Sequence, residues 1–242
     1  NDREREELDE LSRHCRDVIA VRLPAWRSLA NCARPLATSD PLQSHYSWSP
    51  ELMARIDQAR GRFDVAHVEH LRGARYGLAP SGLAASLPTV WDAVDCISDL
   101  FEQAIQHRPD RVGRLINQVE LARTRAYEGR AVAGFDRVLV TSARDKAALV
   151  ALAPGLSTTD HVVVLPNGVD LDYFTPGAEA RESNALVFSG KLSYHANESA
   201  ARFLLGDIMP RVWSSRPDVR LYLVGKDPST DLRRLAAASP DR

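Results

Sequence analysis

The chain is poor in cysteine, has no long apolar run and carries no excess charge of one sign. Its three cysteines, Cys15, Cys32 and Cys96, are odd in number and widely spaced, which argues against a disulfide framework and indicates a reducing compartment. No stretch approaches the ~18 apolar residues that a membrane-spanning helix needs. With 31 basic and 32 acidic residues the net charge is −1, which offers no attraction to nucleic acid.

These deficits place the chain among ordinary globular proteins. We expect the protein to be soluble and cytoplasmic. Peripheral contact with the inner face of a membrane is an alternative, because a small local basic patch suffices for such a contact. The length of 242 residues predicts one large domain or two small ones.

Short apolar runs rich in β-branched residues alternate with helical patterns along the whole chain. The runs that predict strands are residues 17–23, 63–68, 89–94, 136–141, 161–165, 185–189 and 219–225. Helical periodicity is found in residues 50–60, 109–133, 142–152 and 197–214, and we interpret the Arg-rich segment 109–133, with Glu120 and Glu128 among its arginines, as an exposed helix laid over a sheet. This alternation predicts an α/β fold with parallel sheets.

A polar segment with glycine and proline follows Phe174 and predicts a domain boundary. Residues 1–174 read as one Rossmann-like domain that lacks its first strand. Residues 175–242 read as the front part of a second such domain. Parallel sheets bind ligands beyond the carboxyl ends of their strands, so the residues that follow each strand are the candidates for function.

Two strand ends in the second half of the chain have a distinctive composition. The segment VVVLPNGVDLDYFTP, residues 162–176, contains Asn167 and Gly168, a pair that tolerates left-handed backbone angles and predicts a tight turn. In LVFSGKLSYHAN, residues 186–197, Gly190 and Lys191 end a strand just before a helix. A glycine lets a phosphate approach the backbone, while the helix N-terminus and Lys191 supply positive charge.

Other common motifs do not occur. The sequence contains neither GxGxxG nor GxxxxGK[ST], the fingerprints of dinucleotide and nucleoside-triphosphate sites. Asp170 and Asp172 form a DxD pair, but this pair lies inside the segment between the two domains, and we interpret it as structural. We therefore expect no metal and no cofactor.

In this order and spacing, the segments PNGVDLDYFTP, FSGKLSYHANESAARFLLGDIMPRV and RPDVRLYLVGKDPS resemble the family-4 retaining glycosyltransferases, and most closely the exopolysaccharide sugar transferases associated with the PEP-CTERM system. FDVAHVEHLR, PTVWDAVD and FDRVLVTSARDKAAL extend the similarity more weakly. The resemblance implies the GT-B fold, in which two Rossmann-like domains hold a nucleotide-sugar donor and a glycan or lipid-linked acceptor. The glycine-rich N-terminal loop of that family does not occur, and residues 175–242 do not contain the E-x7-E element of its C-terminal domain, so the resemblance predicts a fragment that is inactive alone.

The resemblance also assigns roles to residues of the second half. It places Gly190 and Lys191 at the donor diphosphate. The second basic residue that is usual a few positions later is missing, and His195 or the helix N-terminus at Asn197 would substitute for it. Asn167, Gly168 and Gly225 fall in the interdomain and donor-side loops.

In the first half, His67, His70 and Arg72 follow the 63–68 strand, where the resemblance places the acceptor; solvent exposure is the plainer interpretation of all three. Asp92 and Asp95 end the next strand, where a carboxylate could orient or deprotonate an acceptor hydroxyl, or could cap the helix that follows. Two rival functions stay open: a nucleotide-sugar epimerase of the same architecture, and a non-catalytic module that binds sugar nucleotides.

Overall fold

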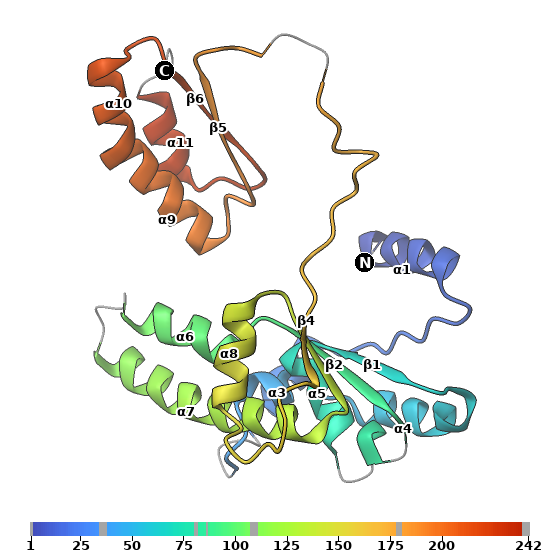
Figure 1. Ribbon diagram of the computed structural model, residues 1–242. Helices are drawn as coiled ribbons and strands as arrows, with labels where there is room; N and C mark the ends of the chain where they lie inside the picture. Colours follow the sequence, from blue (N-terminus) through green and yellow to red (C-terminus); the bar gives the residue numbers. More distant parts are fainter. Residues whose placement is uncertain are drawn as a thin grey trace. The chain divides into compact units, whose positions relative to one another are not determined.

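The computed structural model describes residues 2–33, 38–79, 82–85, 87–106, 111–177 and 181–238. The chain divides into two compact units, Asn1–Val169 and Asp170–Arg242, each with its own buried cluster (Figure 1). The boundary that the sequence suggests, after residue 174, also falls between β4 (Val162–Val164) and β5 (Ala185–Ser189). The fold class is α/β.

The first unit is built on a four-stranded parallel sheet in the order β1-β2-β3-β4 (Figure 1). Its strands are β1 (Ala66–Glu69), β2 (Thr89–Val94), β3 (Arg137–Val140) and β4. The register aligns one buried residue from each strand in a continuous row: Val68, Trp91, Val138 and Val162. This row forms the centre of the core, because side chains in register across a sheet pack against one another.

The helices of the first unit form two groups along the chain. The N-terminal helices are α1 (Asp2–His14), α2 (Ala25–Asn31), α3 (Leu42–Tyr46) and α4 (Pro50–Ala59). The helices that connect the strands are α5 (His70–Leu78), α6 (Ile97–Gln106), α7 (Arg111–Gly134) and α8 (Ala143–Ala151). The α5 helix packs on β1 and β2, α8 packs on β3 and β4, and α7 contacts α5, α6 and α8. Ser49 caps α4 by accepting a hydrogen bond from the N–H of Leu52, and Pro50 follows at the first helical position.

Two sequence expectations about the first unit are wrong. Residues 17–23 form no strand; they are irregular and Ile19 is exposed, because a β-branched run becomes a strand only where a neighbouring strand accepts its hydrogen bonds. The expectation of an exposed helix fails for α7 only in its C-terminal half, because Leu115 and Val119 in its N-terminal half are exposed. Tyr127, Glu128 and Ala131 in its C-terminal half are buried in the unit's core. The other six expected strands are present.

The second unit has two parallel strands, β5 and β6 (Arg220–Val224), joined through helices (Figure 1). The helical segment consists of α9 (His195–Phe203), a π-helical turn (Leu204–Ile208) and α10 (Met209–Ser215), and α11 (Thr230–Ala237) follows β6. These helices lie on one side of the strand pair, and Leu192, Ala201 and Leu232 form the small buried cluster. No helix in the described ranges is both long and apolar enough to cross a membrane.

Candidate functional site

The carboxyl end of β1 borders a cavity of about 380 Å³ in the first unit. Its lining residues are Gln43, Glu69, His70, Leu71, Arg72 and Ile97. His70 has a φ of 61°, a left-handed angle that is uncommon outside glycine and costs backbone energy. The indole Nε1 of Trp91 donates to the carbonyl oxygen of His70 at 3.2 Å and so holds this turn against the sheet. Of the three predicted acceptor residues, His70 and Arg72 line the cavity and His67 does not.

Arg72 is exposed and its guanidinium carbon lies 5.1 Å from the centre of the Tyr46 ring, at the end of α3. Such a stack orients the planar guanidinium and leaves its N–H edges free to meet an anion in a bidentate contact. The cavity therefore carries an oriented cation at its margin.

His67 and Asp92 are brought together on neighbouring strands. His67 Nε2 lies 3.7 Å from Asp92 Oδ2, and both side chains are partly exposed. Asp92 Oδ1 also accepts the N–H of Val94 at 3.1 Å. His67, a predicted acceptor residue, and Asp92, a predicted catalytic residue, thus form one pair. In this pair the carboxylate can accept a proton, and the imidazole can orient the carboxylate.

Asp95 follows an irregular end of β2. Val94 has a φ of 64°, a strained angle for a β-branched residue, and the β2–β3 register shifts between Asp92 and Val94. The hydroxyl of Thr141, just after β3, lies 3.1 Å from the carbonyl oxygen of Val94 and 3.3 Å from Asp95 Oδ1. Asp95 is therefore fixed between the ends of two strands rather than at the start of α6.

The helix α6 is capped by a residue that sequence reasoning missed. Glu128 on α7 is fully buried, and its carboxylate accepts the N–H of Ile97 at 2.7 Å and that of Ser98 at 3.2 Å. Asp145 on α8 accepts the N–H of Cys96 at 3.0 Å. These bonds satisfy N–H groups at the helix start that would otherwise be orphaned. The only sign of this capping role in the sequence is that a glutamate occupies a position of α7 that faces the core.

Burial raises the pKa of Glu128, and the hydrogen bonds from Ser98, Ile97 and Cys96 offset part of this shift. Burial likewise raises the pKa of the neighbouring Cys96 thiol, and the Glu128 charge adds to the effect. The thiol is therefore an inert core group, because the thiolate is the reactive form. The chain at Cys96 and the start of α6 are therefore held by this buried polar cluster.

In the second unit, Gly190 and Gly225 lie together at the carboxyl ends of β5 and β6. A Cβ on Gly225 would overlap the carbonyl oxygen of Gly190, and a Cβ on Gly190 would lie 2.8 Å from the Asn197 amide nitrogen. The N–H of Gly190 donates to the carbonyl oxygen of Val224 at 3.0 Å. Gly225 therefore requires glycine because it packs against backbone, whereas a side chain at Gly190 would displace the Asn197 amide.

Lys191 is exposed beside the start of α9. Asn197 Nδ2 donates to its carbonyl oxygen at 3.1 Å, and the N–H of Tyr194 donates to the same oxygen at 3.0 Å. The helix begins at His195, two residues before the predicted start; the side chain of His195 is outside the described part of the structure. Gly190, Lys191 and Asn197 are thus neighbours, and Asn197 acts on the loop backbone.

The segment between the two units does not form the turn that its sequence predicts. Asn167 and Gly168 are exposed in irregular chain, and no glycine of the described ranges has a positive φ, so the predicted left-handed turn at this pair is wrong. The composition permits such a turn but does not require it. Asp170 Oδ1 accepts the N–H groups of Asp172 and Tyr173 at 3.0 Å each, which gives the DxD pair a local structural contact.

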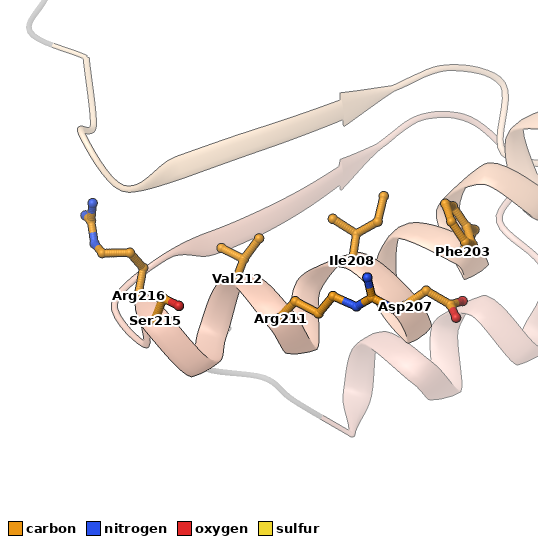
Figure 2. A pocket seen from close by; sticks show the side chains of 7 residues that line it. All are labelled: Phe203, Asp207, Ile208, Arg211, Val212, Ser215 and Arg216. Carbon is orange, nitrogen blue, oxygen red and sulfur yellow. The ribbon is translucent and has the colours of Figure 1, made fainter.

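A further cavity of about 470 Å³ runs along the helical segment of the second unit (Figure 2). Phe203, Ile208 and Val212 line it together with Asp207 and Arg211. None of the predicted donor-site residues lines this cavity, so it is not part of the candidate donor site. Among the residues that the structure describes, no group of three or more His, Cys, Asp or Glu side chains could hold a metal ion.

Comparison with known proteins does not assign the chain. No protein-family model matches it, and no curated protein matches it significantly. The residues and the geometry described above are therefore the basis for a functional proposal.

Proposed function

We propose that this chain is part of a retaining glycosyltransferase of the GT-B type, which transfers a sugar from a nucleoside-diphosphate donor to a hydroxyl of a glycan or lipid-linked acceptor. The observation that carries the proposal is the arrangement at the ends of β5 and β6. Gly190 and Gly225 bring no side chain of their own to the strand ends, the Asn197 amide lies beside Gly190, and Lys191 is exposed beside the N-terminus of α9.

The chemical logic is stabilisation of the leaving group. Negative charge develops on the diphosphate as the sugar departs, and preorganised N–H groups, a helix N-terminus and an ammonium group stabilise that charge. The hydrogen bonds from Asn197 and Tyr194 to the Lys191 carbonyl oxygen fix the backbone of this loop. With front-face attack the leaving phosphate accepts the acceptor proton, so this chemistry needs no metal and no carboxylate nucleophile.

The first unit would supply the acceptor side. In this proposal His70 and Arg72 contact the acceptor from the cavity that they line, and Arg72 binds an anionic group such as a lipid diphosphate. The carboxylate of Asp92, paired with His67, orients the acceptor hydroxyl. Asp95 is the alternative for this role.

Binding of UDP and GDP to the full chain, measured by isothermal titration calorimetry, tests the donor site. Lys191→Ala removes the exposed cation and should weaken diphosphate binding roughly tenfold or more, as expected for a lost charged hydrogen bond. Arg233→Ala, which removes an exposed cation from α11 of the same unit, should leave binding unchanged. Equal affinity of wild type and Lys191→Ala would eliminate the proposed donor site.

Product analysis separates the transferase from its rivals. A longer protein that contains this chain, incubated with a nucleotide-sugar and a lipid-linked acceptor, should yield a glycosylated acceptor with retained anomeric configuration. An epimerised donor sugar formed without an acceptor would indicate an epimerase instead. Nucleotide binding without turnover in any acceptor mixture would indicate a binding module.

A further inference from the structure

The short helix α2 of the first unit buries polar residues and exposes apolar ones. Ser28 and Asn31 are only 4% and 6% exposed, and Asn31 Nδ2 donates to the carbonyl oxygen of Trp48 at 2.8 Å. Trp26 and Leu29 are 68% and 69% exposed. Residues three positions apart lie on the same face of a helix, so Trp26 and Leu29 form an apolar outer face. A surface helix ordinarily turns its apolar residues toward the core, so the outer face of α2 is suited to contact something outside the chain.

Unpaired arginines accompany this apolar face. Arg22 and Arg27 are exposed, and neither forms an ion pair with a side chain in the described part of the chain. The nearest carboxylate along the sequence belongs to Asp17, whose Oδ2 lies 2.9 Å from Nη2 of Arg62, so its charge is already balanced. The preceding helix α1 is acidic, with six carboxylic side chains and three arginines among its 13 residues. The positive charge is therefore local to α2 and the segment that leads into it.

The helix α7 provides a comparison, because it also exposes apolar side chains. Leu115 is 63% exposed. Two arginines of this helix are paired with carboxylates: Arg123 with Glu120 at 3.2 Å and Arg125 with Glu102 at 2.6 Å. In the described part of the chain, exposed apolar side chains therefore coincide with unpaired arginines at α2, whereas the apolar residue of α7 lies on a helix with paired arginines.

We propose that the surface formed by Arg22, Trp26, Arg27 and Leu29, here called the α2 surface, binds an anionic lipid membrane. Trp26 and Leu29 enter the boundary between lipid headgroups and acyl chains, where tryptophan is enriched, and the two arginines contact lipid phosphates. Each contact is weak by itself, so binding requires the apolar and the charged parts together. The inference does not rest on the proposed transferase activity, because attachment to a membrane is measured without donor or acceptor.

Co-sedimentation of the full chain with lipid vesicles tests the charge of the membrane. Vesicles of phosphatidylcholine mixed with phosphatidylglycerol should bind the chain. Vesicles of phosphatidylcholine alone should bind it at least about tenfold more weakly, because the arginines then lack an anionic surface. Added salt should weaken the binding to the anionic vesicles. Equal binding to both kinds of vesicle would overturn the assignment to an anionic surface, and no binding to either would refute the proposal.

Tryptophan fluorescence shows whether Trp26 itself enters the lipid. Of the four tryptophans, Trp26 is the exposed one: Trp91 is buried, and Trp48 and Trp213 are partly buried. The emission of the wild type should shift to shorter wavelength on anionic vesicles, because the indole of Trp26 leaves water. Trp26→Phe keeps an aromatic ring but removes this reporter, so the shift should disappear. A shift that persists in Trp26→Phe would place the lipid contact elsewhere and overturn the proposal.

Two pairs of variants test the α2 surface. Leu29→Ser should weaken binding to anionic vesicles roughly tenfold, because a leucine no longer enters the lipid, and should keep the melting temperature, because this side chain is exposed. Leu115→Ser removes a similarly exposed leucine from α7 and should keep vesicle binding. Arg27→Glu should weaken binding at least about tenfold, whereas Arg233→Glu, the same change of net charge at an exposed arginine of α11, should not. Equal losses within either pair would refute the α2 surface as the contact.

Light scattering without lipid tests the competing occupant, a second copy of the chain. The molar mass of wild type and of Leu29→Ser should be the same, because the partner of the α2 surface is a membrane. A dimer of the wild type that Leu29→Ser dissociates would assign the α2 surface to self-association and overturn the proposal.

Discussion

Gly225 lies against the carbonyl oxygen of Gly190, so that no side chain fits between the ends of the two strands of the second unit. Gly225→Ala must displace one of these strand ends. We expect it to lower the free energy of unfolding of this unit by roughly 1–3 kcal/mol, the usual range for overpacking. Amide hydrogen exchange of β5 and β6 measures the effect.

Gly206, in the π-helical turn of the same unit, is the control for this substitution. A Cβ there would meet no atom within 4 Å, and alanine favours a helix. Gly206→Ala should therefore preserve stability or raise it by up to about 1 kcal/mol. Equal amide hydrogen exchange of β5 and β6 in Gly225→Ala and Gly206→Ala would contradict the close approach of the two strand ends.

Asn197 should matter to donor binding through the loop that it holds. Asn197→Ala removes the hydrogen bond to the Lys191 carbonyl oxygen, and we expect UDP affinity to fall by about 1 kcal/mol, or roughly fivefold. Asn197→Asp cannot donate this bond and adds a negative charge beside the proposed phosphate site, so its loss should be larger. Titration calorimetry checks this order, and an aspartate variant that binds UDP better than the alanine variant would argue against an anion at this loop.

Glu128 should make stability depend on pH. Because burial raises its folded-state pKa above the ordinary value of 4.5, the folded chain holds this proton more tightly than the unfolded chain does. The stability contribution of Glu128 is therefore fully present below the unfolded value and declines as the pH rises through the folded value. Glu128→Gln keeps an acceptor for the N–H of Ile97 but does not titrate.

The measurement is denaturant unfolding of wild type and Glu128→Gln between about pH 4 and pH 8. The stability of wild type relative to the variant should fall as the pH rises. The opposite trend would mean that the N–H groups of Ile97 and Ser98 outweigh burial and hold the pKa below its ordinary value.

Asp92→Asn should separate activity from stability. The His67–Asp92 pair is partly exposed with a 3.7 Å separation, and such pairs contribute about 0–1 kcal/mol, so the melting temperature should change little. If Asp92 orients the acceptor hydroxyl, transfer by a longer protein that contains this chain should fall about 10²-fold or more. Asp95→Asn is the comparison, and a larger loss of transfer in that variant would move the role to Asp95.

Local sequence patterns predicted most of the strands and the helix that begins at residue 50, but they do not specify which elements pack together. The runs 89–94 and 185–189 become strands because a neighbouring strand pairs with each, whereas residues 17–23 are similarly apolar but pair with no strand of the described ranges. The capping of α6 by Glu128 joins residues 31 positions apart and depends on how α7 packs. The His67–Asp92 pair likewise depends on strand register, which composition does not specify.

Four apolar side chains are exposed in the irregular segment that follows β4. Val169, Leu171, Tyr173 and Phe174 are all more than half exposed, Tyr173 by 77%. A protease that cleaves after aromatic residues meets two adjacent targets here in backbone free of sheet hydrogen bonds. Limited digestion with chymotrypsin should therefore cut first at Tyr173 or Phe174 and release two pieces, each of which retains its own buried cluster.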